Sequence, residues 1–181
     1  GQQDSGGLSP RPQIARNNID GFIAEDRAEG EMLAKLAKDP EVKGVIVAIN
    51  STGGSTTGGE ALYEGLRKLA DAKPTVATVG TFGASAAYMA AIATDHIVAR
   101  RTSITGSIGV LFELPEVSDL LDKIGVKVES IKSAPLKAEP NPFTPPSDAA
   151  LAVIQGVVSD TFNWFVDIVA ERRHLPHDQT L

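Results

Sequence analysis

The chain has 181 residues, of which 42% are apolar, and a formal net charge of −6. This length predicts a single domain of ordinary size, and this apolar share predicts a hydrophobic core rather than disorder. Lysines and arginines are scattered, which argues against nucleic-acid binding, because neutralising phosphates requires clustered positive charge. With no cysteine and three dispersed histidines (His96, His174 and His177), the sequence favours neither a thiol nucleophile nor a metal site. We therefore expect no metal and no cofactor.

The two ends of the chain suggest how it is organised. Residues 1–13 are polar and rich in Gly, Ser and Pro, so we interpret them as a flexible linker before a single domain at 14–181. No apolar run approaches the ~18 residues that a membrane span needs. We expect a segment to be missing before Gly1, and a further piece to be missing after Leu181.

The first half of the chain alternates between extended and helical patterns. Short, continuous apolar runs such as 44–49 are typical of buried parallel strands, whereas apolar residues spaced three or four apart indicate helices. In chain order we expect a strand at 14–23, a helix at 27–38, a strand at 42–49, a Gly-rich turn from 50 leading into a helix that ends near 73, a strand at 75–79, a turn and a helix of small residues within 80–93, and a strand at 96–99.

The second half continues the alternation less regularly. We expect a helix at 114–124, a strand at 126–131, a Pro-rich loop at 133–146 and a last helix at 148–173, capped by Ser147. Short apolar strands that alternate with helices predict an α/β fold: a mainly parallel sheet with βαβ crossovers, flanked by helices.

Two predicted strand-to-helix turns attract attention, because sites in open α/β sheets lie beyond the carboxyl ends of the strands. The first turn contains Gly53 and Gly54, and the second contains Ser85. A glycine pair there can bind phosphate, present N–H groups as an oxyanion hole, or simply make a tight turn. The tight turn is the commonest of these, and the sequence fingerprints of phosphate-binding loops are absent.

Ser85 needs a base if it acts as a nucleophile, since an unactivated hydroxyl reacts poorly; the alternative is that it only allows close helix packing. His96 follows 11 residues later, about 16 Å away if the intervening segment is helical, which is too far for proton transfer. A lysine is the remaining option, because burial lowers the lysine pKa and favours the neutral amine. Lys137, between small and apolar neighbours, is a candidate, although a solvated loop lysine is the commoner case.

Four segments, taken together and in order, resemble the signal peptide peptidase A family of Ser/Lys proteases, which have a ClpP/crotonase-like fold. These are 45–51 with the following glycine pair, 84–88, 105–109, and 131–133 followed by Lys137. The resemblance extends over about residues 14–173. It implies Ser85 as nucleophile, Lys137 as general base, Ser107 as the hydroxyl that orients the lysine amine, and the backbone N–H groups of Gly54 and Ala86 as the oxyanion hole.

The resemblance also implies a biological setting. Members are serine endopeptidases that cleave remnant signal peptides or other apolar extended peptides, which a groove would accept by strand addition. They are homo-oligomers, and in short members the Ser/Lys dyad can be shared between protomers. They are tethered to the bacterial cytoplasmic membrane by an N-terminal helix, absent from this sequence, with the protease domain on the extracytoplasmic side.

Two departures from the family pattern concern the substrate groove. Thr52 replaces a proline before the glycine pair, and Ala86 and Ala87 replace glycines after the serine, so their methyl groups are expected to narrow the groove. Three other interpretations stay open at this point: an acyl-CoA enzyme of the crotonase type, a non-catalytic scaffold on the same fold, and a Ser/Lys peptidase specific for membrane proteins.

Overall fold

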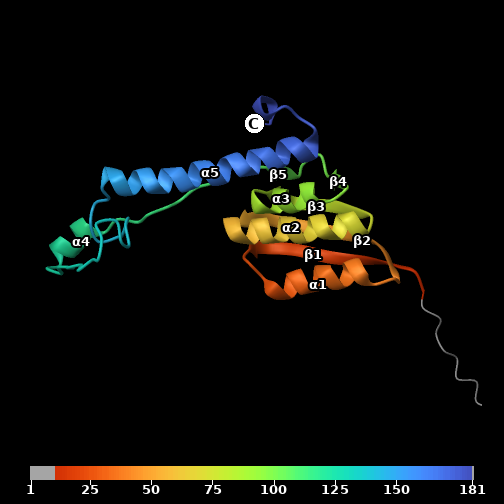
Figure 1. The fold of residues 1–181 in the computed structure, drawn as a ribbon, viewed down its shortest axis with the longest axis horizontal. Coiled ribbons are helices and arrows are strands. Elements are labelled where there is room, and N and C mark those ends of the chain that lie inside the picture. The colour runs from red at the N-terminus through yellow and green to blue at the C-terminus, as the bar shows by residue number, and fades with distance from the viewer. Residues whose placement is uncertain (1–10, 181) are drawn as a thin grey trace, which may run out of the picture. The chain divides into compact units, whose positions relative to one another are not determined.

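The computed structural model describes residues 11–180, so the first ten residues of the predicted linker at 1–13 lie outside the described part (Figure 1). The chain divides into two compact units. Unit 1 combines Gly1–Ile108 with Phe165–Leu181, and unit 2 is Gly109–Trp164. A single catalytic domain at 14–181 stays a prediction.

Unit 1 is built on a parallel sheet. Four strands follow one another in the order β1-β2-β3-β4, and the short strand β5 pairs with the carboxyl end of β3. The strands are β1 (Gln13–Ile23), β2 (Val42–Gly54), β3 (Thr75–Ala84), β4 (His96–Ala99) and β5 (Ile104–Gly106). This is the parallel sheet with flanking helices that the sequence predicted.

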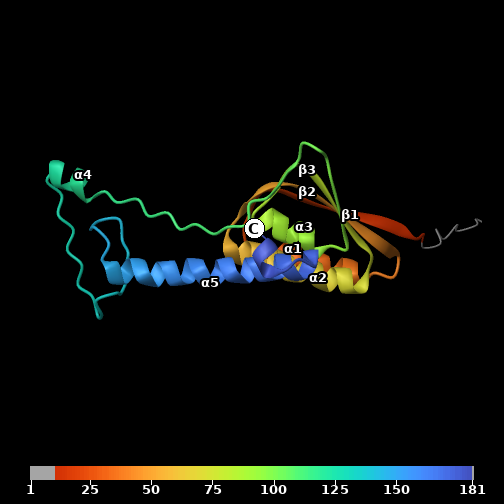
Figure 2. The same cartoon turned by 90° about the horizontal axis from the view of Figure 1, so that it is seen from above.

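Helices connect the successive strands of this sheet. They are α1 (Arg27–Lys38), α2 (Thr56–Ala72) and α3 (Ala86–Ala93). Because right-handed crossovers in one direction put every connection on the same side, the three helices share one face of the sheet, as Figure 2 shows. The N-terminal ends of the helices therefore gather at the carboxyl edge of the strands.

The core of unit 1 lies between this helical layer and the sheet. Burial alternates along β2, with Val45, Val47 and Ile49 buried against the helices. Leu66 and Leu69 of α2 are fully buried, and each contributes about 1.5–3 kcal/mol by leaving water. The apolar periodicity recognised in the sequence thus forms the core.

The strands extend further than the sequence predicted. The expected ends of β2 and β3 were residues 49 and 79, but β2 stays paired with β1 as far as Gly54 and β3 stays paired with β5 as far as Ala84. Glycines and polar residues there resemble a turn in sequence, yet they continue the backbone ladder. Strand β5 was not predicted, because three residues without an apolar run give no strand signal.

Unit 2 contains little regular structure before the last helix. Helix α4 (Ser118–Lys123) is shorter than the helix predicted at 114–124. The strand predicted at 126–131 is wrong: these residues form no strand, and Val126, Val128 and Ile131 are exposed. Their apolar alternation resembles a strand, but no neighbouring segment of unit 2 offers a backbone ladder. The loop at 133–146 is as predicted.

Helix α5 (Asp148–Arg173) begins and ends where the sequence predicted, and it runs through the boundary between the units. The Ser147 hydroxyl accepts a hydrogen bond from the Ala150 N–H at 3.2 Å, which is the expected cap. Its C-terminal part belongs to unit 1, where Phe165 is buried and Arg172 donates to the Ile92 carbonyl at the end of α3 at 2.9 Å. A short 3₁₀ helix, η1 (His177–Gln179), follows.

By length and composition, α5 is the one helix of the described residues that is long and apolar enough to cross a membrane. No continuous apolar run marks this helix in the sequence, because polar residues interrupt the apolar ones along it. Since core helices of water-soluble proteins pass the same test, this property alone does not place α5 in a bilayer.

Candidate active site

The two turns singled out in the sequence meet at the carboxyl edge of the unit 1 sheet. Gly53 and Gly54 end β2, and Ser85 follows β3, the neighbouring strand. Beyond the register shift after Ile49, Ser51 is paired with Gly83, which aligns the two turns side by side. A methyl group on the Gly53 α-carbon would lie 2.8 Å from the Ser85 Cβ and 3.2 Å from its hydroxyl oxygen.

Both glycines of the first turn are required by the geometry. Gly53 has φ +115°, which side-chain-bearing residues rarely adopt, and it faces Ser85 closely. Gly54 has no room for a side chain, since an added Cβ would fall 1.8 Å from the Ile23 carbonyl oxygen of β1. The pair is therefore more than an ordinary tight turn, because it packs strand backbone directly against the serine.

Ser85 has a strained backbone at the start of α3. Its φ is +53° and its ψ is −124°, outside the regions that residues other than glycine normally occupy. Its carbonyl accepts from the Tyr88 and Met89 N–H groups and so begins the helix, while its hydroxyl makes no capping bond. Strain of about 1–3 kcal/mol at a strand-to-helix turn is a feature of nucleophile positions.

Two side chains that were not among the predicted site residues support these turns: Asn50 bridges two strands, and Ser51 is buried. The side-chain amide oxygen of Asn50 accepts from the Thr81 and Phe82 N–H groups, at 3.1 and 3.2 Å, and so links β2 to the end of β3. The buried Ser51 hydroxyl donates to the Gly21 carbonyl and accepts from the Gly53 N–H at 3.1 Å. Polar residues directly after a buried apolar strand were the available signal.

The predicted oxyanion donors are the backbone N–H groups of Gly54 and Ala86. Gly54 lies in the turn beside Ser85, and the next N–H in the chain, that of Ser55, donates to Ile23 of β1 at 2.8 Å. Ala86 is the first residue of α3, so its N–H has no carbonyl one helical turn earlier.

Ser107 comes close to Ser85 through β5. The Ser85 N–H donates to the Gly106 carbonyl at 2.8 Å, and Ser107 is the next residue in the chain. Ser107 also has a positive φ, of +53°, and is exposed. Unit 1 thus brings together Ser85, Ser107 and the backbone of both proposed donor residues.

Lys137 belongs to unit 2, so its pairing with Ser85 stays a prediction. It is exposed in the loop at 133–146, and its N–H donates to the Ala134 carbonyl at 3.1 Å. The loop is closed by an ion pair between Lys132 and Glu139, and this ammonium, which donates to the carboxylate, lowers the pKa of Glu139. Asn141 donates a second hydrogen bond to Glu139 at 3.0 Å.

Two further expectations from the sequence are decided within unit 1. His96 pairs with Val76 at the amino end of β3, whereas Ser85 follows the carboxyl end, so about 30 Å of strand separate them and His96 is excluded as the base. The expectation that Ala86 and Ala87 narrow the groove is wrong, because both are buried among the core residues. Among the described residues, no three His, Asp or Glu side chains gather as a metal site.

Comparison with known proteins adds the family. The model of peptidase family S49 matches residues 67–181, and the model of the Clp protease family matches 14–108. A protein of Methanocaldococcus jannaschii, whose name places it among proteases, is 37% identical over 169 residues, covering 91% of this chain and 54% of that protein. Protease 4 of Haemophilus influenzae is 31% identical over 168 residues, covering 89% of this chain and 27% of that protein.

Solved structures agree on the fold. A mutant of ClpP1 from Listeria monocytogenes has a TM-score of 0.59 at 10% identity, covering 91% of this chain and 75% of that chain. A mutant of the membrane-bound stomatin-specific protease 1510-N has a TM-score of 0.55 at 12% identity, covering 94% and 68%. The chain spans about half the length of its Methanocaldococcus relative. The model of peptidase family S49 matches more than half of the residues of this chain. The chain belongs to peptidase family S49.

Proposed function

We propose that this chain is the catalytic core of a serine endopeptidase in which Ser85 is the nucleophile and Lys137 the general base. The observation that carries this proposal is the strained Ser85 at the start of α3, in contact with the Gly53–Gly54 turn. A serine in this conformation presents its hydroxyl away from its own helix, toward the carboxyl edge where sites in parallel sheets lie.

The proposed reaction proceeds in two halves. The Ser85 Oγ attacks the carbonyl carbon of the scissile peptide bond, and its proton passes to the neutral Lys137 amine. The Gly54 and Ala86 N–H groups stabilise the oxyanion of the tetrahedral intermediate, which collapses as Lys137 protonates the leaving amine. Water, deprotonated by Lys137, then hydrolyses the acyl-enzyme. Ser107 orients the lysine amine.

This mechanism requires Lys137 to be neutral and therefore covered. An ordinary lysine has a pKa near 10.4 and is charged at neutral pH, and burial is what lowers that value. Within unit 2 the side chain is exposed. We therefore propose that the loop at 133–146 is covered in the working enzyme, where Lys137 meets a Ser85 of its own chain or of a neighbouring protomer.

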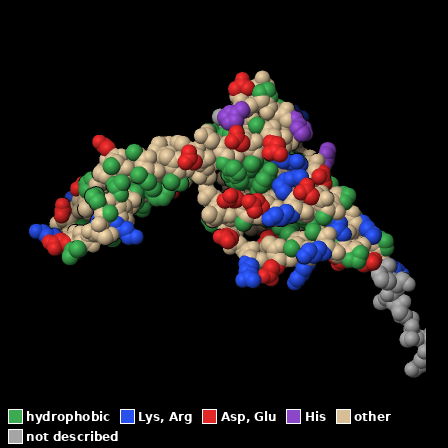
Figure 3. Space-filling view, in the orientation of Figure 1, with side chains coloured by type: hydrophobic (Ala, Val, Ile, Leu, Met, Phe, Trp, Pro, Cys, Tyr) green, Lys and Arg blue, Asp and Glu red, His purple; other side chains and the backbone are tan. Residues whose placement is uncertain are grey.

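Assembly into homo-oligomers is supported by the surface of unit 2. Large apolar side chains are exposed on it, including Leu111, Phe112 and Val157, and Figure 3 shows such side chains gathered over the N-terminal part of α5. Exposed apolar patches mark surfaces that bind protein or membrane. We propose a second copy as the partner, with a membrane anchor outside this sequence.

The proposed substrates are remnant signal peptides and other extended apolar peptides on the extracytoplasmic side of a bacterial membrane. An extended peptide can add its backbone to strand edges near Ser85, as peptides do in other sheets. The relative in Arabidopsis thaliana is named Serine protease SPPA, chloroplastic, and is 29% identical over 153 residues, covering 82% of this chain and 22% of that protein.

Hydrolysis of apolar fluorogenic peptides by the parent, Ser85→Ala and Lys137→Ala tests the proposal, with the mass of each assembly recorded alongside. Activity in the parent that is lost in both variants at unchanged mass supports the dyad. Activity that persists in either variant means that the nucleophile or the base is another residue. An assembled but inactive parent points to a scaffold, and turnover of acyl-CoA thioesters instead of peptides points to a crotonase-type enzyme.

A further inference from the structure

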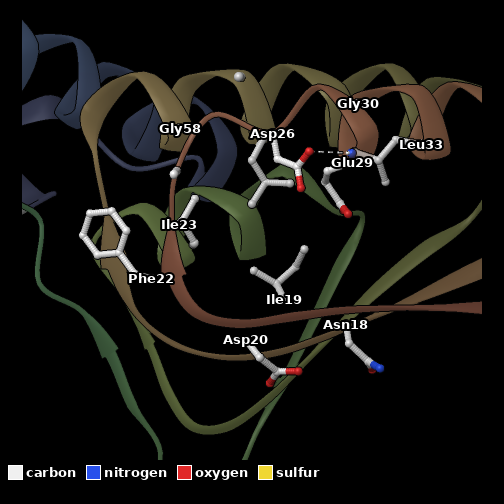
Figure 4. Close-up of a pocket in the computed structure, with 13 residues that line it drawn as sticks. Asn18, Ile19, Asp20, Phe22, Ile23, Asp26, Glu29, Gly30, Leu33 and Gly58 are labelled. Carbon is white, nitrogen blue, oxygen red and sulfur yellow. Dashed lines mark hydrogen bonds between the residues drawn. The ribbon is translucent and has the colours of Figure 1, made fainter.

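A cleft of about 280 Å³ lies in unit 1 beside the carboxyl-terminal half of β1 (Figure 4). It is lined along β1 by consecutive residues from Asn18 to Ile23 (except Gly21), together with Ala24, and by residues of α1 and α2. This volume is near the lower limit of small-molecule sites, so it suits one or two side chains of a peptide rather than a bulky cofactor.

Strand β1 is the outermost strand of the sheet. Among residues 11–180 it pairs only with β2, so one edge of β1 has no strand partner in the described part of the chain. Because strand N–H and C=O groups alternate between the two edges, half of those in β1 point away from β2. An extended peptide can therefore add to β1 through its backbone, with alternate side chains directed to the two faces of the sheet.

The floor of the cleft on the helical face is apolar. Ile19 and Ile23 of β1 face Leu33 of α1 and Leu62 of α2, and all four side chains are buried or nearly so. Phe22 stands at the rim and is mostly exposed, as Figure 4 shows. An aliphatic side chain, or the aliphatic stem of a lysine or arginine, fits against this floor.

The rim of the cleft is acidic on both faces of β1. Asp26 and Glu29 lie on the α1 side, and Asp20 lies on the opposite side of the strand from Ile19 (Figure 4). No lysine, arginine or histidine lines the cleft, and none of these carboxylates forms an ion pair among the described residues. Among the described residues, no lysine, arginine or histidine is therefore paired with these three carboxylates.

Two of these three carboxylates, those of Asp26 and Glu29, also have a structural role, but each uses only one of its oxygens for it. Asp26 caps α1 by accepting from the Ala28 N–H at 2.8 Å, and Glu29 accepts from the buried Asn17 amide at 2.6 Å, in each case through one oxygen. The second oxygen of each carboxylate has no hydrogen bond among those seen in the described residues. Asp20 has neither a capping role nor a hydrogen-bond partner there.

We propose that this cleft binds the positively charged end of an extended apolar peptide, which adds to the free edge of β1. The inference rests on the proposed peptidase function and adds to it a binding place for one part of the substrate, because signal peptides carry a basic segment before their apolar segment. The cleft adjoins the oxyanion turn, because the Ser55 N–H donates to Ile23 at the end of β1. It holds the basic segment while the apolar segment reaches Ser85.

Binding of labelled peptides to an uncleaving Ser85→Ala protein tests this directly. The probes are a fluorescein-labelled Leu/Ala peptide that begins with a lysine pair and the same peptide with a glutamine pair. We expect the lysine peptide to bind about three- to tenfold more tightly, as a few exposed charge pairs allow. This preference should shrink as salt is raised from about 0.05 M to about 0.5 M, because salt screens exposed charges.

Isosteric variants identify the cleft without disturbing the fold. Asp20→Asn, Asp26→Asn and Glu29→Gln, combined in the Ser85→Ala protein, remove the charges and keep one acceptor oxygen for the hydrogen bonds that Asp26 and Glu29 accept. We expect the lysine preference to disappear. The matched control combines Glu31→Gln, Glu64→Gln and Asp71→Asn, which changes the net charge equally at exposed positions outside the cleft. It should keep the preference.

A steric variant gives an independent check. Gly30 lines the cleft on α1, and a Cβ there meets nothing within 4 Å, so Gly30→Leu adds a large side chain at the cleft wall and removes a helix-destabilising glycine. We expect it to weaken binding of both peptides, with Gly30→Ala intermediate. The proposal is overturned if the isosteric triple keeps the lysine preference or if Gly30→Leu binds both peptides normally.

These outcomes are separate from the fate of the peptidase proposal. A parent that hydrolyses apolar peptides while the triple variant keeps its lysine preference rejects the cleft alone. A parent that hydrolyses nothing, while Ser85→Ala shows a lysine preference that the triple abolishes, rejects the peptidase proposal and retains a basic-peptide site.

Discussion

Gly53 and Ser85 are packed so closely that a single methyl group cannot be placed between them. The added Cβ would lie 2.8 Å from the Ser85 Cβ and 3.1 Å from the Ala84 carbonyl oxygen. Residues from the ends of two neighbouring strands thus fix one another, and the position of the serine hydroxyl depends on the glycine.

Gly53→Ala should therefore impair both folding and activity. The alanine must adopt a φ of +115° and displace Ser85, at a cost of about 1–3 kcal/mol in the free energy of unfolding. We expect kcat/KM for apolar peptides to fall about 10²-fold or more, since the displaced turn also carries the Gly54 donor. Urea unfolding and peptide hydrolysis measure the two effects.

The control for this variant is Gly30→Ala, where a Cβ has free space and the backbone is helical. That variant should gain up to about 1 kcal/mol of stability, the opposite of the loss expected for Gly53→Ala. Equal effects of the two substitutions would contradict the role assigned to the Gly53–Ser85 contact.

Ser85→Gly should be inactive and yet more stable than Ser85→Ala. Both variants lack the hydroxyl, but only glycine adopts φ +53° and ψ −124° without strain. We expect a difference in the free energy of unfolding of about 1 kcal/mol in favour of glycine, smaller than the strain itself because glycine loses more chain entropy on folding. Thermal or urea unfolding of the two inactive proteins checks this, and a less stable glycine variant would argue against strain at this position.

Asn50→Ala should reduce activity more than stability. Its side chain joins β2 to the Thr81 and Phe82 N–H groups, which precede Ser85, and these donors are at an exposed part of the edge where water replaces the lost acceptor. We expect about 1–2 kcal/mol of destabilisation and a fall in kcat/KM of about tenfold or more, since small misplacements of a nucleophile are costly.

Asn50→Asp is the matched variant, because its carboxylate offers the same acceptor geometry to the two N–H groups. It should keep most of the stability and activity of the parent. If Asn50→Ala and Asn50→Asp lose activity equally, the side chain acts otherwise than by accepting these hydrogen bonds.

The sequence predicted the architecture of unit 1 because its signals are local. Apolar runs mark β2 and β3, and helical periodicity places α1 with its observed bounds, Arg27–Lys38. The turns were underestimated for a physical reason: glycine-rich segments such as the end of β2 form strands only when a neighbouring strand supplies the ladder. That partner is not encoded locally.

The site was predictable in part. The strand-to-helix position of Ser85 and the glycine pair can be read from the sequence, whereas the Asn50 bridge and the strand β5 that brings Ser107 near depend on contacts between distant segments. The apolar alternation at 126–131 misled because periodicity indicates which face a segment can bury, and unit 2 by itself provides no partner to bury it against.

Acid should loosen the loop that carries Lys137, and Lys132 should delay this loosening. Lys132 donates to the Glu139 carboxylate and thereby lowers its pKa from the usual value of 4.5. A carboxylate with a depressed folded pKa stabilises the folded loop fully above its unfolded pKa and loses this contribution as pH falls through the folded value. The loop in the parent should therefore stay closed somewhat below pH 4.5.

Lys132→Gln separates this charge effect from hydrogen bonding, because glutamine can still donate to Glu139 but carries no charge. In this variant the Glu139 carboxyl should titrate nearer its ordinary value, so the loop should open at a higher pH than in the parent. Amide exchange or limited proteolysis of residues 133–146 across pH 3 to 6 measures the opening. Lys127→Gln, on the exposed segment that precedes the loop, is the control for net charge and should leave the opening pH unchanged. Identical opening in all three proteins would mean that the Lys132–Glu139 pair does not hold the loop, and that the position of Lys137 is set elsewhere.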